Sequence, residues 1–249
     1  ATLTNEQVAA LTSEELLQAI RDLYGKKHDV LYYGPSGEAA AKKMIAEHHK
    51  TSETPESLVR SYPQARQVAS SEVFIAPYDA NQFYYLQYSD RGDKFNAAYD
   101  PSVRMYNSYF GSGMGAIVFQ EMREARGLAY SASAFLTDLG HKDSDYLFYA
   151  FIASQNDKAK DAVEAFDNII NEMPESEKAF EVAKTSLLTG IRTSRTTGID
   201  VLYEYLDLQD YGLTEDRNKA VFEKVQGMTL ADVKAFQEKW IRNRRYVYG

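Results

Sequence analysis

Apolar side chains recur at helical spacing near the start and near the end of the chain, and each recurrence predicts an amphipathic helix. These side chains are Leu16, Ile20 and Leu23 in the first stretch and Val233, Phe236 and Trp240 in the last. Each stretch opens with a threonine three residues before a carboxylate, the pattern of an N-terminal capping box. The two pairs are Thr12 with Glu15 and Thr229 with Asp232. We therefore expect a capped helix at both ends.

Each of these helices leads into a short run that is rich in tyrosine and valine and stops at a glycine, which predicts a strand. The runs are residues 30–34 and 246–249. The sequence thus repeats one helix–strand unit near its two ends. A chance similarity of the two ends is the alternative interpretation.

The repeat predicts how the chain is divided into domains. Residues 1–49 would be the helix–strand–helix tail of a preceding homologous domain. Residues 50–70 are polar, contain Pro55 and Pro63, and would be a linker. Residues 71–249 would then form one complete further domain.

Between the two ends, pairs of strand-like runs alternate with longer helical stretches. Strands are expected at residues 72–76, 82–88, 129–136 and 146–153. Helices are expected at residues 38–49, 100–109, 116–125, 158–172, 176–192, 198–211 and 221–225. Paired strands followed by runs of helices, without regular βαβ alternation, predict an α+β fold. We expect two layers, in which a largely antiparallel or mixed sheet carries helices packed on one face.

Composition and charge narrow the classes of function. The chain has 249 residues, of which 44% are hydrophobic and 26% charged, as in soluble globular proteins. The net charge of −8 argues against nucleic acid as the main partner and is compatible with basic peptides. The sequence contains no cysteine, which excludes a disulfide scaffold, thiol catalysis and a zinc site with cysteine ligands.

The sequence leaves the cellular compartment open, because a chain without cysteine suits either redox environment. No stretch reaches the roughly 18 apolar residues that a membrane span needs. No basic and then apolar signal segment is expected at the start. The chain begins with Ala1 rather than methionine, so we expect a processed product or a piece of a longer protein.

The most specific pattern is a glycine-rich turn, a short charged helix, a glycine stop and a strand that opens with tyrosine. The turn spans residues 109–115, and the helix ends before Gly127. This order resembles the signature of the insulinase, pitrilysin and mitochondrial processing peptidase family of zinc metallopeptidases. The residues that fit it are Phe119, Gln120, Glu121, Arg123, Gly127, Leu128, Ala129 and Tyr130. The resemblance covers most of the chain from about Glu72 onward and implies the domain repeat of inverzincin-type peptidases.

The resemblance implies a chamber of two lobes, built from homologous α+β domains, that holds a peptide substrate between them. One lobe carries zinc on an inverted motif, H-x-x-E-H, whose internal glutamate activates water. The nearest stretch here is residues 44–48, where Met44 stands at the position of the first histidine. We therefore expect no metal site in this chain, and we interpret Glu47, His48 and His49 as a solvated helix end. Zinc is expected in the catalytic lobe of the full enzyme.

In this family the other lobe contributes an arginine and a tyrosine that reach across the chamber. Arg123 and Tyr130, seven residues apart, match that pattern. The resemblance implies that they assist catalysis once a catalytic lobe is present, because a guanidinium and a phenol can donate to the charge that develops on the attacked carbonyl. The alternative is that Arg123 is a surface charge and Tyr130 a half-buried strand residue.

The glycine cluster at Gly111, Gly113 and Gly115 leaves two interpretations once a nucleotide-binding loop is excluded. It lacks the spacing and the lysine of a nucleotide-binding loop. A tight connection between helices or a hinge is one structural interpretation. In processing peptidases a glycine-rich stretch at this place helps to hold substrate, so a peptide-binding role for the three glycines is the other.

Three hypotheses for the function follow. In the first, the chain is the C-terminal, non-zinc-binding portion of a metalloendopeptidase and closes the peptide chamber. In the second, it is an inactive peptide-binding or assembly subunit that pairs with a separate zinc-bearing subunit. In the third, it is an isolated α+β module without a link to peptidases. The partners expected under the first two are the zinc-bearing lobe and a peptide, without nucleic acid.

Overall fold

The computed structural model divides the chain into two compact units, which are described separately. The first comprises Ala1–Tyr62 and Thr197–Tyr203, and the second comprises Pro63–Thr196 and Glu204–Gly249. The structure describes residues 3–58, 62, 64–77 and 79–249. Parts of the expected linker, of the turn between the first two strands and of the N-terminus lie outside the described residues.

The first unit contains three helices in the part of it that is described before residue 59. They are α1 (Asn5–Ala10), α2 (Ser13–Leu23) and α3 (Glu38–His48). Thr12 and Glu15 form the expected capping box at the start of α2, since each side chain accepts from the backbone N–H of the other residue. Helix α2 buries none of its residues, so its apolar stripe lies exposed.

The prediction of a strand at residues 30–34 is wrong. The structure gives this segment no regular secondary structure, and the described strand pairings do not include it. A strand needs a neighbour that takes up its backbone N–H and C=O groups. The backbone pairing in this unit lies instead between the segments around Lys26 and Glu56, which form an isolated parallel bridge.

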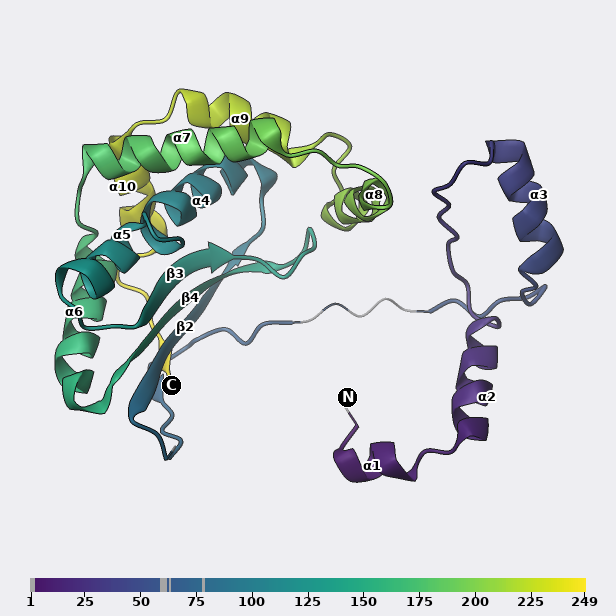
Figure 1. Ribbon diagram of the computed structural model, residues 1–249, viewed down its shortest axis with the longest axis horizontal. Helices are drawn as coiled ribbons and strands as arrows, with labels where there is room; N and C mark the ends of the chain where they lie inside the picture. Colours follow the sequence, from purple (N-terminus) through teal and green to yellow (C-terminus); the bar gives the residue numbers. More distant parts are fainter. Residues whose placement is uncertain (1–2, 59–61, 63, 78) are drawn as a thin grey trace. The chain divides into compact units, whose positions relative to one another are not determined.

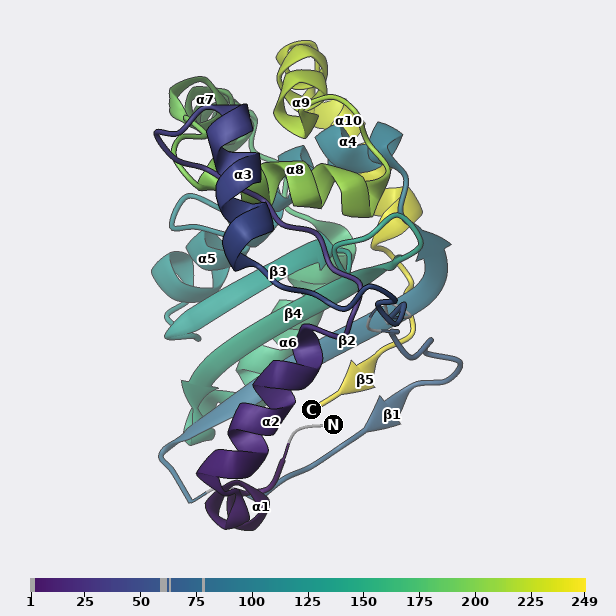
Figure 2. The ribbon, with the colours of Figure 1, turned by 90° about the vertical axis from the view of Figure 1, so that its right-hand side faces the viewer.

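The second unit is built on a five-stranded sheet with the order β1-β5-β2-β4-β3. Figure 2 shows the strands side by side in this order. Strand β1 runs parallel to β5, and the other neighbours are antiparallel. The strands are β1 (Glu72–Val73), β2 (Gln82–Lys94), β3 (Ser131–Thr137), β4 (Asp145–Gln155) and β5 (Val247–Tyr248). Their mixed pairing confirms the α+β fold with a mixed sheet.

Helices of the second unit lie on one side of this sheet, where α4, α6 and α10 pack against the strands and α7 lies over α4 and η2 (Asn107–Gly111) (Figure 1). The α-helices are α4 (Asp100–Tyr106), α5 (Ile117–Phe119), α6 (Ala159–Glu172), α7 (Glu177–Thr193), α9 (Arg217–Gln226) and α10 (Leu230–Trp240), while α8 (Asp200–Tyr211) spans the division between the units. Short 3₁₀ turns lie at Ala97–Tyr99 and Asn156–Lys158. The core between the layers is rich in aromatic residues, among them Tyr106, Phe110, Phe148 and Phe166.

Two of the expected helices are interrupted by π-helical turns. Helix α4 continues as the π-helix η2 (Asn107–Gly111), and α5 continues as η3 (Gln120–Ala125). A glycine-containing loop at residues 112–116 separates the two. A π-turn inserts one residue into the helical ladder and is found mostly as a single turn, often near functional sites. Sequence periodicity alone does not distinguish such a turn from a continuous α-helix.

The C-terminal helix and strand are built into this fold. Thr229 and Asp232 form the second capping box, and α10 buries Val233, Phe236 and Trp240 against the core. The chain then reaches β5, which inserts between β1 and β2. The same sequence pattern is therefore packed at the C-terminal end and exposed in α2.

Candidate functional site

The segment from Arg123 to Tyr130 turns sharply from a helix into the sheet. Gly127 has a positive φ of 58°, a backbone conformation that glycine adopts without strain, and its N–H donates to the carbonyl of Arg123 at 3.1 Å. The N–H groups of Leu128 and Ala129 both donate to the carbonyl of Met122, at 2.9 and 3.1 Å. These bonds confirm the predicted glycine stop and fix the path of the chain between the two candidate residues.

Arg123 and Tyr130 meet across this turn. The guanidinium carbon of Arg123 lies 5.6 Å from the centre of the Tyr130 ring and 5.0 Å from the centre of the Phe119 ring. Both distances are within the range of a cation–π contact. The Arg123 Nε atom also lies 3.7 Å from a carboxylate oxygen of Glu124. The structure therefore brings together the two residues that the sequence pattern selects.

Both side chains are accessible to solvent. Tyr130 is 71% exposed, and the Arg123 side chain is 46% exposed. The backbone of Tyr130 is nevertheless fixed, because its N–H donates to the carbonyl of Ala153 in β4 at 2.8 Å. An arginine and a phenol that are anchored at the backbone and open at their tips can donate hydrogen bonds to an anionic oxygen or to a peptide carbonyl.

The three glycines of the loop have different surroundings. A Cβ atom on Gly111 would lie 1.5 Å from the carbonyl oxygen of Ala134, so Gly111 permits the backbone of η2 to pack directly on β3. Gly113 has a φ of 96°, and a Cβ atom on Gly113 or Gly115 would meet no atom within 4 Å. The structure thus gives Gly111 a packing role, whereas Gly113 and Gly115 lie in an open loop.

The edge of β3 beside this loop is closed by a side chain. The amide of Asn107 in η2 donates to the carbonyl of Leu136 at 2.8 Å and accepts from the N–H of the same residue at 2.9 Å. An asparagine amide therefore imitates a neighbouring strand at this point. A peptide that added to the sheet as a further strand would find this position of the β3 edge occupied.

The face of the sheet opposite the helices carries aromatic side chains. Successive side chains of a strand point to opposite faces of the sheet. Tyr85 contacts Phe166 of α6, so the residues on either side of Tyr85 in β2 point away from the helices. In β4, Phe148 and Ile152 lie in the core, so the adjacent residues Tyr149 and Phe151 point to the other face of the sheet.

We call the five residues on that side the aromatic face: Tyr84, Tyr88, Phe135, Tyr149 and Phe151. Their ring centroids lie 5.2 to 6.1 Å apart in neighbouring pairs across the strands. Burial raises the pKa of Tyr88 to about 12, helped by the nearby Asp90 carboxylate, which moves it further above the neutral range in which tyrosine is already protonated. The face therefore offers rings and neutral hydroxyls, which suit apolar and polar peptide side chains alike.

A polar pocket of about 390 Å³ lies elsewhere in the second unit, among α4, α8 and α9. Arg217 makes a bidentate ion pair with Asp100 at 2.9 and 3.0 Å, and its guanidinium carbon lies 4.1 Å from the centre of the Tyr211 ring. Burial on its own lowers the pKa of Arg217, but the bonds to Asp100 outweigh this effect and raise it. Burial also raises the pKa of Asp207, which borders the same pocket. No motif in the sequence indicates this pocket, since Asp100 and Arg217 are 117 residues apart.

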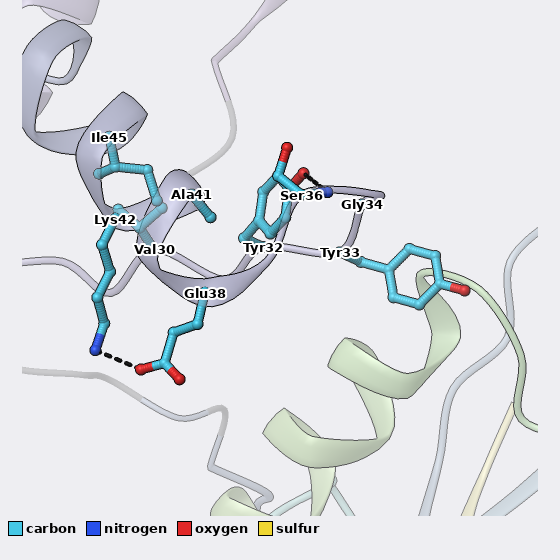
Figure 3. A pocket seen from close by; sticks show the side chains of 9 residues that line it. All are labelled: Val30, Tyr32, Tyr33, Gly34, Ser36, Glu38, Ala41, Lys42 and Ile45. Atoms are coloured by element: carbon cyan, nitrogen blue, oxygen red, sulfur yellow. Dashed lines mark hydrogen bonds and ion pairs between the residues drawn. The ribbon is translucent and has the colours of Figure 1, made fainter.

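A second hollow, of about 420 Å³, lies in the first unit between the coil that follows Val30 and helix α3. Figure 3 shows its lining: Val30, Tyr32, Tyr33, Gly34, Ser36, Glu38, Ala41, Lys42 and Ile45. The backbone N–H of Ser36 donates to the Tyr32 hydroxyl at 3.2 Å, and Lys42 pairs with Glu38 at 2.6 Å. These contacts hold the walls of the hollow, and among its lining residues they do not pair a nucleophile with a general base.

The described residues hold no group of three or more histidine, aspartate or glutamate side chains that could bind a metal ion. Residues 44–48, the stretch nearest to an inverted zinc motif, form the end of α3. Within the same described part of the chain, no helix is long and apolar enough to cross a membrane.

The model of one protein family, described as the peptidase M16 inactive domain, matches residues 10–187. A crystal structure of a peptidase M16 inactive domain from Pseudomonas fluorescens has 17% identity and a TM-score of 0.63, over 98% of this chain and 58% of that chain. The periplasmic protease PqqL from Escherichia coli has 18% identity and a TM-score of 0.66, over 100% of this chain and 28% of that chain.

The ferredoxin protease FusC, solved in complex with Arabidopsis ferredoxin, has 12% identity and a TM-score of 0.67, over 100% of this chain and 27% of that chain. No curated protein matches the sequence. The chain thus spans 58% or less of the length of these solved structures, whose likeness at such identities is one of fold. The family match, in contrast, covers more than half of the sequence. It confirms the resemblance to the insulinase-type peptidases, and the chain belongs to the family of the peptidase M16 inactive domain.

Proposed function

We propose that this chain is the non-catalytic, C-terminal portion of an insulinase-like zinc metalloendopeptidase. It closes a peptide chamber together with a zinc-bearing lobe, which is either part of the same polypeptide or a separate subunit. Zinc and the H-x-x-E-H motif belong to that lobe, and this chain by itself is inactive as a peptidase. The observation that carries the proposal is the accessible pair of Arg123 and Tyr130, held in contact at the start of β3.

The proposed domain division rests on the contrast between the two capped helices. Residues 1–49 form the tail of a preceding homologous domain, residues 50–70 a linker, and residues 71–249 a complete domain. Helix α10 buries its apolar stripe in the second unit, while α2, with the same capping pattern, buries none of its residues. An amphipathic helix is stabilised mainly by covering its apolar stripe, so α2 requires a further core of its own.

In the proposed mechanism, Arg123 and Tyr130 act on the substrate rather than on the metal. When water attacks a peptide carbonyl, negative charge develops on the carbonyl oxygen. The Tyr130 hydroxyl and the Arg123 guanidinium donate to that oxygen or to the adjacent substrate backbone. The cation–π contact holds the guanidinium near the phenol before the substrate arrives, which reduces the entropy lost on binding.

The aromatic face is the proposed wall of the peptide chamber. Its five rings lie on the side of the sheet opposite to α6. The net charge of −8 would favour basic peptide segments. FusC, whose fold is similar, was solved with a folded protein, ferredoxin, and we extend this only to the proposal that the chamber takes polypeptides. Gly113 and Gly115, in the open loop, are further candidate contacts to the substrate backbone, and Gly111 is a weaker one because it is buried.

The experiment that tests the proposed role is the turnover of the complete enzyme with Tyr130→Phe. We expect kcat to fall by about tenfold or more, because one donor to the developing charge is lost, while the thermal stability stays unchanged. Tyr203→Phe is the matched control, since Tyr203 is a similarly exposed tyrosine, at 63%, outside the motif. Unchanged turnover in Tyr130→Phe would refute the role.

The second candidate function is an inactive binding or assembly subunit. It shares the chamber and the partner of the first proposal but needs no contribution of Arg123 or Tyr130 to turnover. The exposed apolar stripe of α2 favours assembly with another body in either case. Stable co-purification with a distinct zinc-bearing chain, combined with wild-type turnover of the Tyr130→Phe complex, would select this second function.

A further inference from the structure

Two histidines of the first unit point their ring nitrogens at each other. The Nε2 atoms of His28 and His49 lie 2.7 Å apart, and the two rings meet edge-on with centroids 5.0 Å apart. The residues are 21 positions apart in sequence, so the fold and not the local chain brings them together. Nothing in the proposed peptidase function uses this pair.

The tautomer of His28 follows from its second contact. Its Nδ1 atom lies 2.8 Å from the backbone carbonyl oxygen of Lys26. A carbonyl oxygen only accepts, so Nδ1 carries the proton and Nε2 presents its lone pair toward His49. A histidine whose Nδ1–H donates to a backbone carbonyl while Nε2 stays free is the usual arrangement of a metal-binding imidazole.

Backbone hydrogen bonds tie the chain before His28 to the chain after His49, and the N–H of Ser52 donates to the carbonyl of Tyr24 at 3.2 Å. The N–H of Lys27 donates to the carbonyl of Glu56 at 2.8 Å, and the N–H of Glu56 donates to the carbonyl of Gly25 at 2.9 Å. The side chains of Lys26 and Glu56 form an ion pair across the same bridge. His49 itself is held at the end of α3, where its N–H donates to the carbonyl of Ile45 at 2.8 Å.

We propose that His28 and His49 form a two-imidazole site for a divalent transition-metal ion of the Zn²⁺, Ni²⁺ or Cu²⁺ class. Imidazole nitrogens are suitable ligands for these three ions. Two nitrogens bound to one tetrahedral zinc lie about 3.4 Å apart, given a metal–nitrogen bond of about 2.1 Å. The pair at 2.7 Å would therefore open by a small rotation of two side chains at the surface. Water would complete the coordination, since the described residues supply no third ligand there.

The bound ion would act as a clip. It would join the C-terminal end of α3 to the segment around Lys26 and so restrain the intervening chain, which includes α3. In the absence of metal, the same geometry is a hydrogen bond from His49 Nε2–H to His28 Nε2. Metal binding replaces this bond: His49 takes its other neutral tautomer, with the proton on Nδ1, so that both Nε2 atoms present a lone pair to the ion. The site is independent of the zinc of the proposed catalytic lobe, because both of its ligands lie in this chain.

The test is a calorimetric titration of the present chain with Zn²⁺, with the variants His28→Asn and His49→Asn. His48→Asn is the matched control, since His48 is the neighbouring histidine on α3 and is exposed. We expect saturable binding of one ion per chain, at least about tenfold weaker binding in each of the first two variants, and unchanged binding in the control. Circular dichroism checks that each variant is folded.

A second measurement uses the wild-type chain alone. With one equivalent of Cu²⁺, the electron paramagnetic resonance spectrum should show coupling to two imidazole nitrogens. Absence of saturable Zn²⁺ binding, binding that persists in both single variants, or a loss that follows His48→Asn instead would overturn the proposed site.

Discussion

At the scale of single residues, the backbone decides what Arg123 and Tyr130 can do. The π-turn and the positive φ of Gly127 end the helix such that a guanidinium and a phenol seven positions apart come into contact. Their contact follows from the local turn alone, so it does not require a partner to form. A substrate or partner would meet the pair already oriented.

If Arg123 has the proposed role, we expect its charge alone to be insufficient for it. Arg123→Lys keeps the positive charge but loses the planar fork of donors and its stacking on Phe119 and Tyr130. We expect the turnover of the complete enzyme to fall by about tenfold, with the pH profile unchanged. Arg126→Lys, a charge on the same segment, is the control; an equal effect of both variants would show that only the local charge matters.

The packing role of Gly111 gives a prediction on stability. In Gly111→Ala the added methyl group meets the backbone oxygen of Ala134, which cannot move without disturbing β3. We expect a loss of about 1–3 kcal/mol in the free energy of unfolding, measured with urea. Gly115→Ala should leave stability nearly unchanged, because its Cβ atom would meet nothing within 4 Å. Equal stabilities of the two variants would contradict the assigned packing.

Asp167 in α6 gives a prediction on pH dependence. It accepts hydrogen bonds from the Tyr85 hydroxyl at 3.1 Å and from the Gln87 amide at 2.5 Å. Burial nevertheless raises the pKa of Asp167, and the two bonds offset only part of this effect. The folded state therefore keeps the proton to a higher pH than the unfolded state, and the contribution of this group to stability falls as the pH rises through that window.

The comparison of wild type with Asp167→Asn isolates that contribution. The stability of the wild type relative to the variant should increase as the pH is lowered from about 7 to about 4. Urea unfolding at both pH values measures it, with Asp161→Asn, an exposed carboxylate on the same helix, as the control. A difference between wild type and Asp167→Asn that does not depend on pH would contradict the assigned effect of burial.

At the scale of elements, local signals in the sequence predicted most of the helices and strands. The capping boxes at Thr12 and Thr229 and the stop at Gly127 are local patterns, and the structure confirms all three. Strand β2 is longer than expected because Gly92, with a φ of 78°, lies in a bulge through which pairing resumes at Lys94.

Structural features that depend on residues far apart in the sequence could not be predicted from the sequence. The segment at residues 30–34 has the composition of a strand, but composition cannot supply a partner strand. The bidentate pair of Arg217 and Asp100 and the contact of His28 with His49 join residues far apart in sequence, and no short pattern indicates them. The π-turns differ from α-helix by one residue per turn, which is too small a change for periodicity to detect.

The two capped helices allow a comparison of equivalent substitutions. Thr229→Ala removes the capping bond of α10, which is packed in the core of the second unit, and should lower its stability by about 1 kcal/mol. Thr12→Ala makes the same change in α2, which buries no residue, and should leave the main unfolding transition unaltered. Differential scanning calorimetry measures both; a similar loss in Thr12→Ala would show that α2 belongs to the same cooperative unit.

At the scale of the whole molecule, the chain carries two features that the proposed complete enzyme would cover. The stripe of α2 lies exposed, and the aromatic face lies on the side of the sheet opposite to α6. The family match assigns the chain to an inactive domain, and it spans 28% and 27% of two similar solved proteases. We interpret these features as surfaces for a zinc-bearing lobe and for the peptide that the two bodies enclose.

The most direct test of this account is the composition of the native particle in the source cells. An antibody raised against this chain would isolate the particle, and mass spectrometry would identify every polypeptide in it. The account predicts a particle larger than 28.2 kDa that contains an H-x-x-E-H sequence, either in a longer form of this polypeptide or in a second chain. A particle of 28.2 kDa without such a sequence would contradict it.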